Sequence, residues 1–549
     1  MTFLSLTSAR PLRRYGFPAA LVDLPATIPA LLAARASERE ADFVVGPEFR
    51  LTFGDADERS ATLAARLLAA GVGKGTRVGV LFPNRAEWVV TWLAAARVGA
   101  LTVPLSTFSP SAELARAIRH ADVQVLLSAP RFADHDLCLR LEGALDGLSS
   151  SSSELELPAA PFLRWVNIDG DEPPVWSRVL PSPIADAVLR AAEAEVMPAD
   201  ALAIISTSGA TAAPKAVVHT QGSLVRHAAL LARRRALTPD DRIYSPMPFF
   251  WVGGLTMVLL QAMSSGAAAV VQERFDAGEA LMMAERERAT QISCWPNAAR
   301  AMAEHPTFAS RDLSSVRGGT LIEALPIEQR PPSPDLAPTL LGMTETGGPH
   351  TAPEDPYSPL PEALRGTFGQ SLPGVEHCVV DPSSGVEIGR AELGELMLRG
   401  PFLMESLYKR ERHETFTPDG WYATGDLGWF DCDGNLYFAG RRTTMIKSGG
   451  SNVSPGEVED VLRDCTGVRA AFVFGVPAGD RGEDVVAVVA TAPGAVVDEA
   501  TLTASARRQL SSFKVPRNWR IVEERALPML PTGKADLAAL RSWFGAGTE

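Results

Sequence analysis

The apolar residues between positions 50 and 128 alternate between two spacings, one typical of helices and one typical of strands. Helical spacing runs over residues 55–70, and Gly71 follows where a helix C-terminus favours glycine. Two further segments share this helical spacing, 85–98 and 111–121. The remaining apolar runs are short and predict buried strands, at 77–82, 101–103 and 123–127. Such alternation is typical of parallel strands joined by crossover helices, so it predicts an α/β fold of layered sheets.

A second, smaller alternation follows residue 440. Residues 440–459 are dense in glycine and polar turn residues, which is typical of domain junctions and moving loops. Beyond them the periodicity predicts two helices and two strands, the helices at 456–464 and 502–510 and the strands at 470–476 and 485–489. A chain of 549 residues is too long for one hydrophobic core. We therefore predict a large N-terminal domain over residues 1–440 and a small α+β domain over residues 441–549.

The composition is that of an ordinary globular protein, with 46% hydrophobic and 21% charged residues. The net charge of −13 argues against nucleic acid as a partner, because a phosphate backbone attracts a basic surface. The five cysteines lie far apart without a CxxC pair, which favours buried thiols in a reducing compartment. Arginines follow the few apolar residues of the first twenty positions, the reverse of a secretory signal. The longest apolar stretch, 255–271, is interrupted by polar residues, so we expect a cytoplasmic protein without an integral membrane segment.

A loop of small and hydroxyl residues follows the apolar run 202–205 and ends at Lys215. Small residues let backbone N–H groups approach an anion, hydroxyls donate to its oxygens, and lysine supplies charge, so the loop is typical of a phosphate site. It is not a Walker sequence, because no Gly-Lys-Ser/Thr opens a helix here. A polar hairpin between two strands, the second containing Val217 and Val218, is the open alternative.

Four other segments carry candidate chemistry, each with a plainer alternative. The aromatic run at 245–254 is able to line an apolar ligand slot, and ordinary core packing explains it equally well. Thr344 can donate to phosphate and Glu345 can bind Mg²⁺, although a lone Thr-Glu pair is weak evidence. Asp426 follows a turn and can accept hydrogen bonds from ribose hydroxyls. Lys534 lies on a tight turn, where a merely exposed lysine is the plainer interpretation.

In their order and spacing these motifs resemble the adenylate-forming superfamily, and within it the acyl-CoA synthetases, over nearly the whole chain. The resemblance implies a large N-terminal domain of layered sheets with a small β-barrel, and a mobile C-terminal domain that rotates between two half-reactions. It also implies a ligase that uses ATP, Mg²⁺ and coenzyme A. A carboxylate would attack the α-phosphorus of ATP to give acyl-AMP and pyrophosphate, and a thiol would then displace AMP.

The resemblance assigns most of the candidate residues to the nucleotide. Five loop residues would lie along the pyrophosphate, namely Thr207, Ser208, Gly209, Thr211 and Lys215. The adenine side of the site would include Gly318, Gly319, Thr320 and Gly342. Thr344 would contact the α-phosphate, and Glu345 would bind Mg²⁺. Asp426 and Arg441 would hold the ribose.

The remaining assignments concern the acid and the thiol. By resemblance, Lys534 would bridge the substrate carboxylate and the AMP moiety, stabilising developing charge. Thr443 would be the hinge, and the rotation would bring three residues to the thiol, Lys447, Gly449 and Gly450. The acyl pocket would be walled by five uncharged residues, Trp251, Val252, Gly253, Gly254 and Trp295. We therefore expect an apolar acid of the fatty, aryl or alicyclic kind, and a context in fatty acid metabolism.

Free coenzyme A is the expected acceptor, and two alternatives stay open. The segment 450–459 resembles acyl-CoA synthetases more than peptide-synthetase domains, and the sequence ends fifteen residues after Lys534 without a carrier domain. One alternative is transfer to a separate carrier protein. The other is a non-catalytic homologue that binds nucleotide or acyl ligand, motivated by an altered phosphate loop with Ala210, Ala212 and Ala216. Further departures from the family pattern occur at Leu341, Thr443, Thr444 and Trp251. A homodimer is one open oligomeric state.

Overall fold

The computed structural model describes residues 24–206, 215–442, 446–448, 451–453, 455–478, 483–510, 514–530 and 534–545. They fold into two compact units. The first unit contains residues 24–376 and 399–420, and the second contains the described residues of 377–398 and 421–545. Residues 377–398 and 421–440, which precede the predicted boundary, thus belong to the same unit as the C-terminal segment. The domain boundary at 440/441 stays a prediction.

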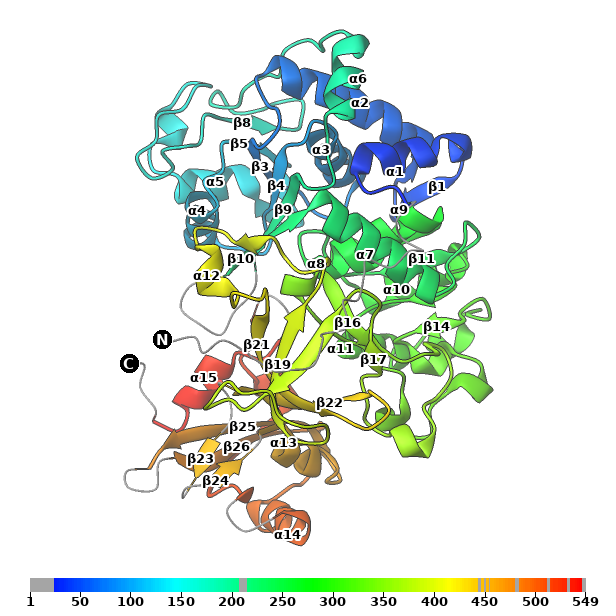
Figure 1. Cartoon of the computed structure of the whole chain (residues 1–549), viewed down its shortest axis with the longest axis vertical. Helices are drawn as coiled ribbons and strands as arrows, with labels where there is room; N and C mark the ends of the chain where they lie inside the picture. Colours follow the sequence, from blue (N-terminus) through cyan, green and yellow to red (C-terminus); the bar gives the residue numbers. More distant parts are fainter. Residues whose placement is uncertain are drawn as a thin grey trace. The chain divides into compact units, whose positions relative to one another are not determined.

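A seven-stranded sheet is the first structural layer of the first unit, with the order β20-β10-β9-β4-β3-β5-β8 (Figure 1). Its strands are β3 (Arg77–Leu81), β4 (Leu101–Pro104), β5 (Val125–Ser128), β8 (Trp165–Ile168), β9 (Ala201–Ser206), β10 (Ala216–Thr220) and β20 (Ser406–Leu407). The strands from β8 to β9 run parallel, as the alternating pattern predicts. β10 and β20 are antiparallel additions at one edge.

The helices around this sheet begin and end where local signals place them. They are α2 (Phe53–Ala69), α3 (Ala86–Arg97), α4 (Ser111–His120), α5 (Leu137–Ala144) and α6 (Asp186–Ala194). A capping box between Thr52 and Asp55 starts α2, and Gly71, with φ +82°, follows its end. The chain passes from β3 to β4 in one direction and back to β5 in the other, so right-handed crossovers place α3 and α4 on opposite faces (Figure 1).

A six-stranded sheet forms the second layer, with the order β14-β13-β11-β12-β1-β2. Its strands are β1 (Asp42–Val45), β2 (Arg50–Thr52), β11 (Arg242–Ser245), β12 (Ala268–Val271), β13 (Gln291–Ile292) and β14 (Gly318–Gly319). The accompanying helices are α1 (Ile28–Ala34), α7 (Gln221–Arg234), α8 (Val252–Gly254), the π-helix η4 (Leu255–Leu260), α9 (Gln261–Ser265), α10 (Ala277–Arg286) and α11 (Pro296–Ala303). The apolar stretch 255–271 is therefore helix and strand of the core, as predicted.

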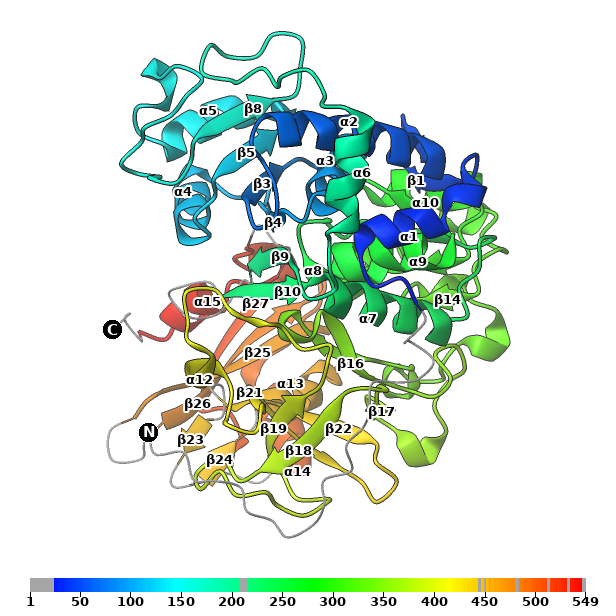
Figure 2. The same ribbon diagram turned by 45° about the horizontal axis from the view of Figure 1, so that its top comes forward.

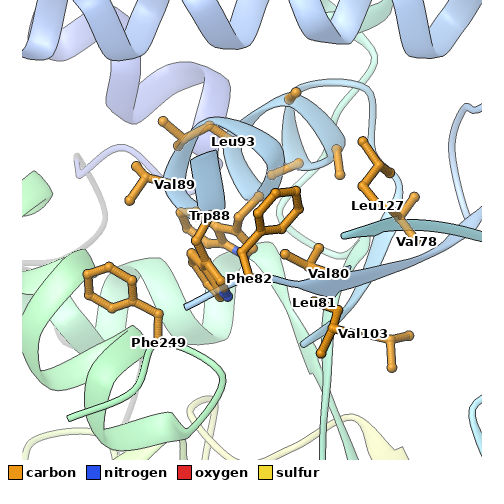
Figure 3. Packing of buried hydrophobic residues seen from close by; sticks show 14 of the residues in the cluster. Val78, Val80, Leu81, Phe82, Trp88, Val89, Leu93, Val103, Leu127 and Phe249 are labelled. Atoms are coloured by element: carbon orange, nitrogen blue, oxygen red, sulfur yellow. The ribbon is translucent and has the colours of Figure 1, made fainter. Parts of the chain in front are cut away.

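One hydrophobic core joins the two sheets of the first unit. It includes Val80 of β3 and Ile243 of β11, and Trp88 of α3 is fully buried between such residues. Figure 3 shows Trp88 beside Phe249, whose ring centroid lies 5.2 Å from that of the indole. The tryptophans of α3 are thus packing residues, in agreement with the apolar periodicity of that segment.

Antiparallel strands complete both units, in the region where a small β-barrel was expected. In the first unit they form a sheet of β15 (Leu341–Met343), β16 (Gly348–Ala352) and β17 (Gln370–Ser371). The same unit also contains the hairpin of β6 (Arg131–Phe132) and β7 (His135–Asp136), and the short helix α12 (Arg412–Thr415). In the second unit they form β18 (Glu376–Val380), β19 (Gly394–Arg399), β21 (Tyr422–Phe430) and β22 (Leu436–Arg441). β15-β16-β17 and β18-β19-β21-β22 are separate sheets, and β6-β7 is a third of two strands.

The C-terminal part of the second unit is a small α+β arrangement. Its elements are β23 (Ile446–Ser448), β24 (Ser451–Val453), α13 (Pro455–Arg463), β25 (Val468–Pro477), β26 (Glu483–Thr491), α14 (Glu499–Gln509), β27 (Asn518–Glu523) and α15 (Leu537–Ser542). Figure 2 shows α13 beside β25, and Val458 and Leu462 of that helix join Val473 and Val489 in the local core. The predicted fold class, mixed α/β with several sheets and a distinct C-terminal domain, is confirmed.

Two expectations about the chain's surroundings can be compared with this structure. All five cysteines are free thiols, in agreement with their dispersed spacing. Across the described ranges, no helix is both long enough and apolar enough to cross a membrane.

Candidate active site

The loop assigned to the pyrophosphate connects β9 to β10. These two strands are antiparallel neighbours, and Ser206 at the end of β9 pairs with Ala216 at the start of β10. Four of its candidate residues lie outside the described residues, namely Thr207, Ser208, Gly209 and Thr211. Lys215 is the first described residue after the loop. The antiparallel pairing of β9 with β10 is compatible both with a plain polar connection and with a phosphate-binding loop.

Lys215 and Glu345 are 130 residues apart in sequence and meet in the first unit. Glu345 lies in the 3₁₀ turn η9 (Thr344–Thr346), between β15 and β16, and the turn ends at Gly347 with φ +67°. Lys215 Nζ lies 3.4 Å from Glu345 Oε1, and the lysine side chain is 41% exposed whereas the glutamate side chain is 7% exposed. A shielded carboxylate thus lies beside a cation that reaches solvent. The structure brings together two residues that the resemblance assigned to phosphate and metal.

His219, which the sequence analysis did not single out, contacts the same turn. Its side chain is fully buried on β10, and Nε2 donates to the Thr344 carbonyl over 2.7 Å. Burial lowers the pKa of His219 to about 4, although the Thr344 carbonyl and the Glu345 carboxylate act in the opposite direction. The imidazole is therefore neutral at pH 7. The only sequence signal was a polar residue on the buried strand after Val218, and a lone histidine there is more often plain core.

The segment assigned to adenine forms β14, next to β13. Gly319 has φ +118°, and a Cβ built there would lie 2.0 Å from the Ile292 carbonyl oxygen, so the chain approach excludes a side chain. Thr320 hydrogen-bonds Cys294, whose amide N lies 3.0 Å from the threonine Oγ1. Burial raises the pKa of the Cys294 thiol to about 11, so this thiol stays protonated. Gly342 is similarly close to a neighbouring strand, since its built Cβ would lie 2.7 Å from the Gly348 carbonyl oxygen.

The residues assigned to the acyl pocket lie within an aromatic cluster. Trp251 and Trp295 meet edge to face with ring centroids 5.8 Å apart, and Phe108 lies 6.1 Å from Trp251. Both tryptophans are half-buried, as are Val252 and Gly253. The chain then enters the π-helix η4, a rare geometry that often occurs at functional sites. A partly accessible aromatic wall suits an apolar ligand, and the wall carries no charged side chain.

Gly254→Ala and Gly253→Ala form a matched pair that tests this backbone. A Cβ at Gly254 would lie 2.1 Å from the Pro248 carbonyl oxygen, whereas one at Gly253 would meet only the Met247 Sδ at 3.0 Å. We expect Gly254→Ala to destabilise the protein by about 3 kcal/mol or more, because backbone must move. Gly253→Ala should cost less than about 1 kcal/mol, because a methionine side chain can adjust. Thermal unfolding of both variants measures the difference, and equal midpoints would contradict the predicted close approach.

The residues assigned to ribose face each other in the second unit. Asp426 on β21 and Arg441 on β22 are register partners, and Arg441 Nε lies 2.8 Å from Asp426 Oδ1. The aspartate is buried and the arginine is exposed, so the pair has one side towards solvent. A second pair lies beside it: Glu395 accepts a hydrogen bond from the Gly425 N–H over 3.1 Å and pairs with Arg442 over 2.7 Å. Glu395 is not among the candidates named from the sequence, although a charged residue inside the apolar strand β19 was a signal.

The remaining candidates belong to the C-terminal part. Lys534 is exposed, and its carbonyl accepts a hydrogen bond from the Leu530 N–H over 2.7 Å; residues 531–533 between them lie outside the described residues. Lys447 lies in β23, and its side chain is outside the part of the chain that the structure describes. Three further candidates lie outside it entirely, namely Thr443, Gly449 and Gly450. Their roles stay predictions.

Comparison with known proteins identifies the family. The sequence matches the AMP-binding enzyme family over residues 32–408, and the AMP-binding enzyme C-terminal domain over residues 457–534. The chain belongs to the AMP-binding enzyme family. Within the adenylate-forming superfamily it falls in the acyl-CoA synthetase branch, as the order of motifs predicted. The predicted enzyme class, an AMP-forming acid–thiol ligase, agrees with the names of its relatives.

Two relatives and one solved structure illustrate this membership. The 3-[(3aS,4S,7aS)-7a-methyl-1,5-dioxo-octahydro-1H-inden-4-yl]propanoyl:CoA ligase of Mycobacterium tuberculosis is 33% identical over 491 residues, covering 87% of this chain and 91% of that protein. The sulfoacetate–CoA ligase of Cupriavidus necator is 29% identical, covering 92% of this chain and 96% of its own. The structure of the anthranilate CoA ligase AuaEII in complex with anthranoyl-AMP has the same fold, with a TM-score of 0.77, 22% identity, and coverage of 95% and 98%.

Proposed function

We propose that this member of the AMP-binding enzyme family is a carboxylate–CoA ligase. It activates an apolar fatty, aryl or alicyclic acid with ATP, releasing pyrophosphate, and transfers the acyl group from acyl-AMP to coenzyme A. The observation that carries the proposal is that the shielded Glu345 carboxylate lies 3.4 Å from the Lys215 ammonium. Lys215 stands at the end of the loop of small and hydroxyl residues. A cytoplasmic location and a homodimer are further parts of the proposal.

The first half-reaction needs charge stabilisation and in-line positioning more than covalent help. Lys215 would compensate charge on the pyrophosphate, and Thr344 would contact the α-phosphate. Asp426 would accept hydrogen bonds from the ribose hydroxyls, with Arg441 beside it at 2.8 Å. Lys534 would supply positive charge where the acid carboxylate attacks the α-phosphorus.

Mg²⁺ fits the Glu345 side of the site. The ion favours hard oxygen ligands, and the Glu345 carboxylate and the Thr344 hydroxyl offer such oxygens on one turn. Glu345 would hold the ion, which when bound neutralises charge on the phosphate oxygens. The chain's own contribution is to keep the carboxylate at a constant place beside Lys215.

The two relatives act on acids of different chemistry, one alicyclic and one a sulfonate, so their names do not select a class of acid for this protein. The class proposed here therefore rests on the aromatic wall. Trp251 contacts Phe250, Phe108 and Trp295 with ring centroids between 5.2 and 6.1 Å apart. Burying the apolar part of an acid against such rings is favourable. An acid with a second charged group, such as sulfoacetate, would lose the hydration of that group without gaining a partner for it. An apolar acid is therefore the better substrate.

Thioester formation tests the proposal directly. The protein is incubated with ATP, Mg²⁺, coenzyme A and single fatty, aryl or alicyclic acids, with sulfoacetate as the polar comparison, and products are identified by mass spectrometry. Acyl-CoA from one apolar class supports the proposal. Acyl-AMP that accumulates with coenzyme A present would favour transfer to a carrier protein instead. Folded protein that binds ATP and forms neither product would favour a non-catalytic homologue.

Lys447→Ala is expected to separate the two half-reactions. Thioester formation should slow by about tenfold or more while acyl-AMP formation changes by less than about threefold, because the lysine is assigned to the thiol step. Single-turnover measurements of acyl-AMP and acyl-CoA give both rates. Lys514→Ala is the matched control, since Lys514 belongs to the same unit and pairs with Glu457 over 2.6 Å. Equal losses in both steps would contradict the assignment.

A further inference from the structure

The turn that carries Thr344 and Glu345 is anchored through its backbone carbonyls. The Thr344 carbonyl accepts from His219 Nε2 over 2.7 Å and from the Gly347 N–H over 2.9 Å. The Glu345 carbonyl accepts from the Met404 N–H over 2.7 Å. The second of these bonds lies within the turn, but the other two come from segments far away in sequence. The position of the Glu345 side chain therefore depends on distant contacts.

Both distant anchors lead back to one strand. His219 is itself a residue of β10. Met404 precedes β20, which pairs with β10 through Val217 and Val218, and the Glu405 N–H donates to the Val218 carbonyl over 2.8 Å. β10 begins at Ala216, directly after Lys215. The strand that begins directly after Lys215 thus also holds the turn that carries the Glu345 carboxylate.

The chemistry of the His219 bond is set by its acceptor. A carbonyl oxygen has no proton to give, so Nε2 must carry the hydrogen and donate. The imidazole is fully buried, and without its donor the Thr344 carbonyl would keep only the short-range hydrogen bond from the Gly347 N–H. Leucine at position 219 would keep the apolar packing and remove the donor, whereas glutamine would offer an amide N–H at a similar reach.

We propose that His219 is a positioning residue, which holds the Thr344–Glu345 turn against β10 so that Glu345 and Lys215 face the same phosphate and metal. The inference rests on the proposed function, in which Glu345 holds Mg²⁺. His219 touches neither the nucleotide nor the ion in this assignment. It acts only through the Thr344 carbonyl, over the 2.7 Å hydrogen bond.

Amide hydrogen exchange of the ligand-free protein tests the anchor itself. In His219→Leu we expect the peptide over residues 343–348 to exchange about tenfold faster, because one of its long-range hydrogen bonds is lost. In His219→Gln the same peptide should stay within about twofold of the unchanged protein. Thr102→Val is the matched control, since it also removes a buried side-chain donor to a backbone carbonyl of the first unit, from Thr102 Oγ1 on β4 to Leu202 over 2.8 Å. Equal exchange in all three variants would overturn the proposal.

Calorimetric titration of ATP with and without Mg²⁺ then tests the consequence. The measured quantity is the factor by which Mg²⁺ increases the affinity for ATP. We expect this factor to be about tenfold smaller in His219→Leu than in the unchanged protein, while the affinity for metal-free ATP stays the same. His219→Gln and Thr102→Val should keep the increase in ATP affinity that Mg²⁺ gives. If Mg²⁺ increases the ATP affinity of His219→Leu as much as that of the unchanged protein, the role of His219 is overturned and the proposed function is not. The absence of any Mg²⁺ increment in the unchanged protein would overturn the proposed function and this inference with it.

Discussion

Replacement of Lys534 by alanine is expected to slow acyl-AMP formation by about 10³-fold and to leave the fold intact. The reason for the loss is that a positive charge placed where negative charge develops contributes several kcal/mol in a site closed to water. The reason for the intact fold is that the side chain is exposed, and that Lys534 accepts the hydrogen bond from the Leu530 N–H, 2.7 Å long, through its backbone carbonyl. ATP–pyrophosphate exchange with the acid identified from the panel measures the rate.

The control for Lys534 is again Lys514→Ala, which removes a lysine from the same unit. Lys514 pairs with Glu457 rather than with any assigned substrate, so acyl-AMP formation should stay within about twofold of the unchanged protein. Circular dichroism and thermal unfolding of both variants confirm that folding is comparable. Full exchange activity in Lys534→Ala would refute the assignment. Loss of activity in both variants would point to a structural effect of lysine removal.

Glu345→Gln is expected to lower the Mg²⁺-dependent rate of acyl-AMP formation by about 10²-fold or more. The amide keeps the size of the side chain but removes the charge that holds a hard cation. Because Glu345 is buried and lies 3.4 Å from Lys215, the substitution also leaves that cation without its carboxylate neighbour. The apparent Mg²⁺ concentration for half-maximal rate should rise, while the acid KM changes little. A metal titration at saturating ATP separates these effects.

Glu285→Gln is the matched control for Glu345. Glu285 lies on α10 of the same unit and pairs with Arg311 over 2.8 Å, with no assigned part in the reaction. Its substitution should leave the metal dependence unchanged, because a solvent-screened surface ion pair contributes little to stability and has no assigned part in the reaction. A Glu345→Gln variant with normal metal dependence would exclude Glu345 as the Mg²⁺ ligand. A shift of equal size in both variants would indicate a general effect of charge.

The secondary structure was well predicted because its causes are local. The apolar spacing over 55–70 produced α2 (Phe53–Ala69), and Gly71 follows its end with positive φ as expected. The short apolar run at 202–205 became β9, buried on both faces. Periodicity reports which side of an element is buried, and that information lies within a few residues of each position. The family resemblance came from a different source, the order and spacing of the sequence motifs.

The predicted site was visible only in part. Lys215 and Glu345 were named from residue type, yet their 3.4 Å contact spans 130 positions and depends on β10 and the β15–β16 turn lying together. His219 had no sequence signal that separates an anchoring imidazole from a packed one. Glu395 had a weak signal, a charge within an apolar strand, but its partner Arg442 depends on strand order in the sheet β18-β19-β21-β22.

The sequence by itself determined the α/β elements, the two-part organisation of motifs, and the chemical types of the candidate residues, since these depend on neighbours along the chain. Tertiary structure alone decided which strands pair, that β10 holds both the Lys215 cation and the turn bearing Glu345, and that Gly254 admits no side chain. The physical reason is that strand pairing and close backbone approach are long-range contacts. Their free energy is shared among many residues, and no local pattern records it.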